Sequence, residues 1–110
     1  MKVRLIKLQT IEHYVLKNAG SKRPFTDWIT KVKGADWKDP EDILKTFGSA
    51  DLLSGGSRRI IFDIGGNNYR MICSYVFGAR KAHLFINWIG THAEYTLLCR
   101  RNEQYVVNKY

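Results

Sequence analysis

Three polar side chains in the second half of the chain, Arg70, His92 and Tyr95, are of types that can act together on a phosphodiester. Arginine pairs with phosphate oxygens, histidine transfers protons near neutral pH, and tyrosine can transfer a proton or stack on a base. Such a set suffices for metal-free RNA cleavage. In that reaction a base deprotonates the 2′-hydroxyl, which attacks the adjacent phosphate, and an acid protonates the leaving 5′-oxygen.

Three strands are predicted around these residues. Runs rich in β-branched and aromatic residues at 59–64, 69–77 and 82–89 are separated by turn sequences at 65–68 and 78–81. They predict an antiparallel meander. The middle run alternates apolar residues with the set Arg70, Ile72, Ser74 and Val76, so one of its faces is apolar and the other mixed. We expect a solvent-facing site on the mixed face. Asn67 and Asn68 are interpreted as turn formers that tolerate positive φ.

A capping box, Thr91 with Glu94, predicts a short helix directly after the third strand. That helix carries His92 and Tyr95. Adjacent strands lie about 4.8 Å apart, so the two side chains are expected near Arg70. The helix start also presents amides and a positive dipole end, which suit a phosphate. The tail, 100–110, has weak strand character at 105–107.

The first half predicts one strand and three helices. The strand spans 2–7, and Thr10 is expected to cap a first helix that ends near Gly20. A second helix is predicted from Lys22 to Lys33, with an apolar face and an end at Gly34. A third begins after the capping Asp39, with Pro at its first position, and runs to 47. Loops are expected at 48–51 and 54–57. Trp28 and Trp37 are interpreted as packing residues.

Composition narrows the class of protein. The chain has 110 residues, of which 45% are apolar, and this favours one folded domain over disorder. No apolar stretch approaches the roughly 20 residues of a membrane span, and the N-terminus lacks the apolar core of a signal peptide. Two cysteines without CxxC spacing fit a reducing compartment, so we expect a cytoplasmic protein. The net charge of +8 favours nucleic acid as partner, and an acidic protein is the alternative that would give the same charge balance.

The segment IFDIGGNNYR at 61–70, followed by WIGTHAEY at 88–95, resembles the HigB toxin family of type II toxin–antitoxin systems. The likeness covers about residues 1–98 and includes Pro24, Trp28, 35–37, 45–47 and 50–51. One departure is Thr96, where the family usually has Asp. Another is the tail, 99–110, which the family pattern does not explain.

This resemblance implies an α+β, RelE-like fold, with an N-terminal strand and helices packed on a small antiparallel sheet and a short C-terminal helix. It implies a bacterial endoribonuclease that cuts translated mRNA on the ribosome and is neutralised by a HigA-like helix-turn-helix antitoxin. Arg70 corresponds to the family's phosphate-binding arginine, and His92 and Tyr95 to its acid–base and stacking pair.

Further candidates and alternatives follow from the residues. Secondary candidates for RNA binding are Arg59, Arg80 and Lys81. The simplest interpretation of these three residues is that they are solvated surface charges. His13 and His83 share no ligand spacing with a Cys or an acid, so we expect no metal and no cofactor. The alternative function is a non-catalytic basic module that binds RNA or protein, either a degenerate toxin or an inhibitor of another target.

Overall fold

The computed structural model describes residues 1–54 and 56–110. Gly55, within the expected 54–57 loop, lies outside the described residues. A five-stranded sheet has the order β1-β5-β4-β3-β2. The strands are β1 Lys2–Ile6, β2 Asp51–Leu52, β3 Arg59–Ile64, β4 Tyr69–Phe77 and β5 Lys81–Thr91, and the helices are α1 Leu8–Lys17, η1 Ala19–Ser21, α2 Lys22–Lys33, α3 Pro40–Thr46 and α4 His92–Arg100.

The predicted meander is confirmed. β3 pairs antiparallel with β4, and β4 with β5, while β1 adds a parallel edge strand beside β5. β3 and β4 have the predicted bounds, whereas β5 extends to Thr91 at the start of α4. The α+β fold is confirmed as well.

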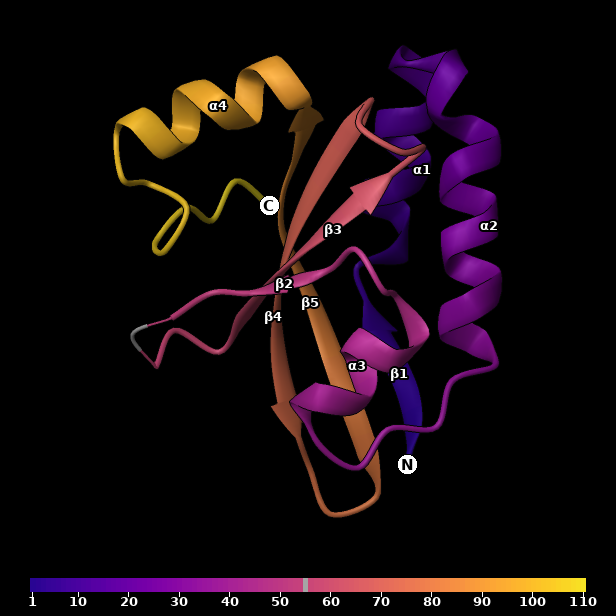
Figure 1. The fold of residues 1–110 in the computed structure, drawn as a ribbon. Coiled ribbons are helices and arrows are strands. Elements are labelled where there is room, and N and C mark those ends of the chain that lie inside the picture. The colour runs from indigo at the N-terminus through magenta and orange to yellow at the C-terminus, as the bar shows by residue number, and fades with distance from the viewer. Residues whose placement is uncertain (55) are drawn as a thin grey trace.

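Helices α1 and α2 pack on one face of the sheet (Figure 1). The apolar side of β4 faces them, and Met71 and Cys73 are fully buried in the main core. From α2 the core receives Phe25, Trp28 and Val32. Trp28 and Trp37 are 3% and 1% exposed, which confirms them as packing residues.

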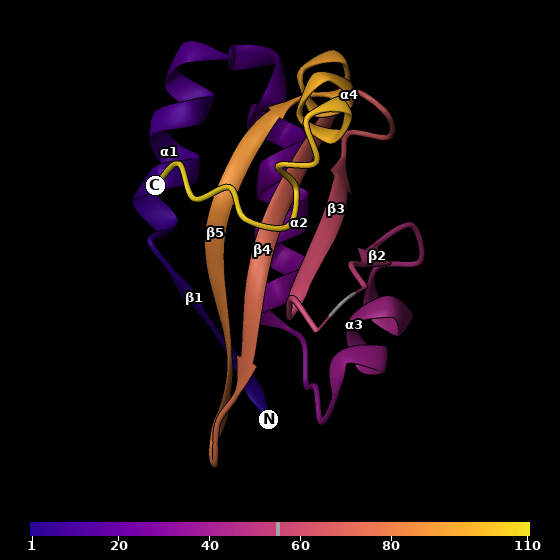
Figure 2. The ribbon, with the colours of Figure 1, turned by 90° about the vertical axis from the view of Figure 1, so that its left-hand side faces the viewer.

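The opposite face carries α4 and the C-terminal tail, which crosses in front of β4 and β5 (Figure 2). A second, smaller core lies there, formed by Ile61, Ile72, Trp88 and Leu98. The mixed face is therefore open to solvent only in part, since a helix and a loop seal its apolar residues. The tail forms turns rather than a strand at 105–107, so that prediction is wrong.

Several local predictions need correction. Helix α1 begins at Leu8, and Thr10 lies inside it rather than capping it. The helix ends at Asn18, whose Nδ2 donates to the Tyr14 carbonyl, and a 3₁₀ turn follows in place of a glycine stop.

The turn between β3 and β4 also differs from its prediction. Positive φ occurs at Gly65 and Gly66 rather than at the two asparagines, because glycine adopts that region without steric cost. The Asp39 cap of α3 is confirmed, since its side chain accepts from the Asp42 amide.

Candidate functional site

Arg70 lies in β4 between two neighbouring strands. It pairs in register with Asp63 of β3 and with Gly90 of β5. Its Nε lies 2.7 Å from Asp63 Oδ1, and both side chains are largely buried, at 16% and 19% exposure. The contact is an ion pair rather than an aligned hydrogen bond. An anion that approaches Arg70 therefore competes with the Asp63 carboxylate for the guanidinium.

Tyr95 reaches Arg70 from helix α4. The guanidinium carbon lies 5.3 Å from the centroid of the phenol ring, within the range of a cation–π contact. The ring also packs at 6.1 Å on Trp88, which belongs to the second core. The arginine and the tyrosine thus converge, as the sequence predicts.

Gly90 makes room for this arrangement. A Cβ at that position would lie 2.5 Å from two ring carbons of Trp88, whose indole extends across the glycine. The indole supports the Tyr95 ring only because residue 90 has no side chain.

An irregularity in β5 turns Trp88 toward the site. Ile72 pairs with Trp88 while Cys73 pairs with Ile86, so Asn87 is an extra residue in the strand. The bulge shifts the alternation by one position. Ile86 therefore faces the main core and Trp88 the second core. Asn87 is held by Ser74, whose hydroxyl donates to Oδ1 at 2.7 Å.

His92 is the first residue of α4, and its side chain is exposed. The predicted capping box is confirmed: Thr91 N donates to Glu94 Oε1 at 2.8 Å, and Glu94 N donates to Thr91 Oγ1 at 3.2 Å. His92 N donates to the carbonyl of Asn68 at 3.2 Å. Three backbone amides at the start of α4 therefore already donate hydrogen bonds within the protein. Few amides remain there to bind a phosphate, contrary to the expectation from the sequence.

Burial sets the protonation of the tyrosine. It raises the pKa of the Tyr95 phenol well above its usual value, with a further contribution from the Cys99 thiol, and outweighs the opposing effect of Arg70. A tyrosine of ordinary pKa is already protonated near neutral pH, and burial makes its ionised form rarer still. Tyr95 can therefore donate a proton or a hydrogen bond but is a poor candidate for the base.

Comparisons with known proteins show the family of this chain. Residues 21–98 match the family HigB_toxin, described as the RelE-like toxic component of a toxin–antitoxin system. The chain belongs to this family. It is also 32% identical over 69 residues to the mRNA interferase HigB of Escherichia coli O6:H1 strain CFT073, a match that covers 63% of this chain and 65% of that protein. The match thus spans less than two thirds of that relative's length.

The HigB family match ends at Leu98, so the tail lies beyond it. Arg59 explains how the tail is held. It is 8% exposed, and its Nη1 donates to the carbonyls of Gln104 at 3.3 Å and Val107 at 2.7 Å. Burial lowers the pKa of this guanidinium. The expectation that Arg59 grips RNA is corrected, because its charge is used within the fold.

Arg80 and Lys81 lie at the other end of the sheet. They belong to the β4–β5 hairpin, which Figure 1 shows far from α4. Both side chains are exposed. The structure therefore does not bring them together with Arg70 and Tyr95. As surface cations they remain candidates only for contacts with RNA at a distance from the cut site.

Sequence reasoning missed three residues of the candidate site: Asp63, Trp88 and Gly90. Asp63 carried a signal, because it is an acid on the mixed face of a strand predicted to pair with the strand of Arg70. No sequence signal marked Trp88 and Gly90, because their orientation depends on the extra residue Asn87 in β5.

Thr96, which stands where the family usually has Asp, fits within α4: its hydroxyl donates to the His92 carbonyl at 3.1 Å. Within the described ranges, no three His, Cys, Asp or Glu side chains cluster as metal ligands, and no helix is long and apolar enough to cross a membrane.

Proposed function

We propose that this HigB-family toxin is a metal-independent endoribonuclease that cleaves translated mRNA on the ribosome. The observation that carries the proposal is the contact between Arg70 of β4 and Tyr95 of α4, two residue types that serve phosphodiester cleavage. The E. coli relative is named an mRNA interferase, which supports the same activity. The net charge of +8 favours a polyanionic substrate.

In the proposed mechanism Arg70 holds the scissile phosphate and stabilises its developing negative charge. The phosphate displaces Asp63 from the guanidinium in part, since both anions seek the same donors. Tyr95 is protonated near neutral pH, and burial further disfavours its ionised form, so it donates to the reacting group or stacks beneath a base.

His92 is the candidate proton acceptor for the 2′-hydroxyl. It is exposed at the first position of α4, three residues before Tyr95, so the two side chains lie on neighbouring positions of one helix surface. Attack of the 2′-oxygen forms a new P–O bond and breaks the bond to the 5′-oxygen, which takes up a proton from the Tyr95 phenol. The products are a 2′,3′-cyclic phosphate and a 5′-hydroxyl, and no metal takes part.

Partners follow from the family. A toxic component of a toxin–antitoxin system is matched by an antitoxin, which we propose to be HigA-like, with a helix-turn-helix domain. An acidic surface on that partner would complement the basic toxin. Action on translating ribosomes places the protein in the cytoplasm of a bacterial cell.

The test is primer extension on a defined mRNA, with and without translating ribosomes, in the presence of a chelator. His92→Ala should lower the cleavage rate by roughly 10²- to 10⁴-fold, the range for loss of a general acid or base. His13→Ala is the matched control, because His13 is an exposed histidine on α1. A substrate with a single 2′-deoxyribose at the cut site should resist cleavage.

Each outcome decides a part of the proposal. Cuts that need ribosomes and vanish in the His92 variant support it, whereas cuts without ribosomes retain the nuclease and refute ribosome dependence. Cleavage by a folded His92→Ala protein at the normal rate refutes the role of His92. Absence of cuts in every condition refutes the nuclease and leaves the binding module.

A further inference from the structure

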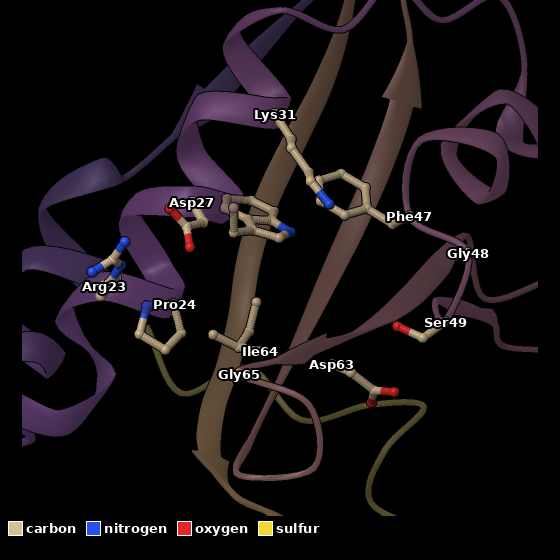
Figure 3. A pocket seen from close by; sticks show the side chains of 11 residues that line it. Arg23, Pro24, Asp27, Lys31, Phe47, Gly48, Ser49, Asp63, Ile64 and Gly65 are labelled. Carbon is tan, nitrogen blue, oxygen red and sulfur yellow. The ribbon is translucent and has the colours of Figure 1, made fainter.

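A cavity of about 410 Å³ lies beside the site, at the outer edge of β3 (Figure 3). Strand β2 pairs only with Ile60 and Ile61, so within the described residues 62–64 of β3 have no strand on their outer side. Helix α2 and the loop after α3 form the other walls. The size is that of a pocket for one small ligand.

Aromatic side chains form much of the wall. Phe47 is half-buried and stacks on Trp28 at 5.9 Å between ring centroids, with 26° between the planes. Lys31 Nζ lies 5.8 Å from the Phe47 centroid, on the cavity side. An aromatic face next to a cation is typical of sites that stack a base close to its phosphate.

An unsatisfied donor lies in the same wall. Trp28 Nε1 is buried and has no hydrogen-bond partner among the residues that the structure describes, whereas Trp37 Nε1 donates to Thr46 Oγ1 at 2.9 Å. A buried donor without an acceptor is costly, so each such group calls for an explanation. A ligand with an oxygen or ring-nitrogen acceptor would satisfy it. Since Nε1 lies under the cavity surface, neighbouring side chains must shift as the ligand enters.

Charge at the rim connects the cavity to the candidate site. Arg23 and Lys31 are exposed cations from α2 that line it, and the exposed acid Asp27 lies one helical turn from each of them on the same wall (Figure 3). Asp63 lines it as well, and the same carboxylate pairs with Arg70 one strand further in. Asp63 therefore lies between Arg70 and the cavity and links the two.

We propose that this cavity binds one nucleotide of the RNA next to the scissile phosphate. The base lies against Phe47 and accepts from Trp28 Nε1, and the phosphates on its two sides contact Arg23 and Lys31, clear of the Asp27 carboxylate between them. The inference rests on the proposed function for the identity of the polymer, and it assigns to these α2 residues a part in substrate binding. Gly65 and Pro24 both line the cavity and lie close together: a Cβ at residue 65 would lie 3.1 Å from Pro24 Cγ.

The experiment follows the indole N–H signals of the full chain in a ¹⁵N–¹H spectrum during titration with a short 2′-O-methyl oligoribonucleotide, which cannot be cleaved. Trp28→Phe assigns its signal. We expect the Trp28 resonance to shift with saturation while that of Trp37, already bonded to Thr46, stays in place. The double variant Arg23→Gln/Lys31→Gln should weaken binding and reduce the salt slope by about 0.7 for each lost phosphate contact.

The control is Lys33→Gln, which removes an exposed lysine of α2 outside the cavity. An oligonucleotide that binds without moving the Trp28 resonance overturns the inference and leaves the nuclease proposal intact. The single variants Arg23→Gln and Lys31→Gln each remove one charge, as Lys33→Gln does. If the Lys33→Gln variant loses as much affinity as these single variants, the inference is overturned, as it is if an acidic peptide but not RNA shifts the Trp28 resonance. A Trp28 shift in a protein that cuts no mRNA supports the nucleotide site and refutes the nuclease separately.

Discussion

Arg59→Met tests whether a buried cation holds the C-terminal tail on the sheet. Methionine keeps most of the apolar stem of arginine but removes the guanidinium. The group lost makes two hydrogen bonds, to the carbonyls of Gln104 and Val107. Gln104 is 9% exposed, so water reaches its carbonyl poorly once the donor is gone.

The expected loss can be worked from these contacts. Hydrogen bonds to charged groups contribute about 1.5–3 kcal/mol each. Relief of the desolvation penalty of the guanidinium offsets a part of the sum. We expect a decrease of about 2–4 kcal/mol in the free energy of unfolding, or about 8–16 °C in Tm at roughly 4 °C per kcal/mol.

The assay is urea unfolding followed by tryptophan fluorescence, with Arg80→Met as the control at an exposed hairpin position. A second background, truncated after Arg100, removes the tail carbonyls. There the cost of Arg59→Met should fall to that of the control. A loss below about 1 kcal/mol in the full chain, or the same loss with and without the tail, would refute the reasoning.

Three further predictions concern the site and the pH dependence of stability. Gly90→Ala should destabilise the protein by about 1–3 kcal/mol, because the new Cβ meets the Trp88 ring, and should lower activity by displacing Tyr95; thermal unfolding and cleavage rates measure both. Asp63→Asn should strengthen RNA binding at low salt by releasing Arg70, and unchanged affinity in a folded variant would contradict the competition. Burial raises the pKa of Tyr14 from 10.0 to about 12, so its contribution to stability is complete below pH 10 and is lost between pH 10 and 12; this loss should be smaller in Tyr14→Phe, as unfolding midpoints across that range will show.

Local patterns were sufficient for most elements of this fold. Helix α2 has its predicted bounds, and Asp39 caps α3 as expected, because capping and 3.6-residue periodicity act within one turn of the chain. Strand β4 likewise follows from alternation and flanking turns. The errors lie where a boundary depends on packing: Lys7 in the left-handed region begins α1 without a side-chain cap, ahead of Thr10.

The candidate site was also predicted only in part from local patterns. Arg70 and Tyr95 could be predicted to approach each other, because strand pairing and the Thr91–Glu94 cap are short-range features. The burial of Arg59 could not be predicted, because its hydrogen-bond partners lie in the tail, 45 and 48 residues later in the chain. A strand arginine on a mixed face has the same sequence pattern whether it is solvated or buried.

The sequence by itself therefore determined most of the elements, the meander and the residue types for phosphodiester chemistry, because each depends on interactions between neighbours in the chain. Only the tertiary structure decided which face Trp88 and Gly90 take, through the extra residue at Asn87. One inserted residue reverses the side of every later side chain in a strand, and its position is set by cross-strand pairing rather than by local propensity.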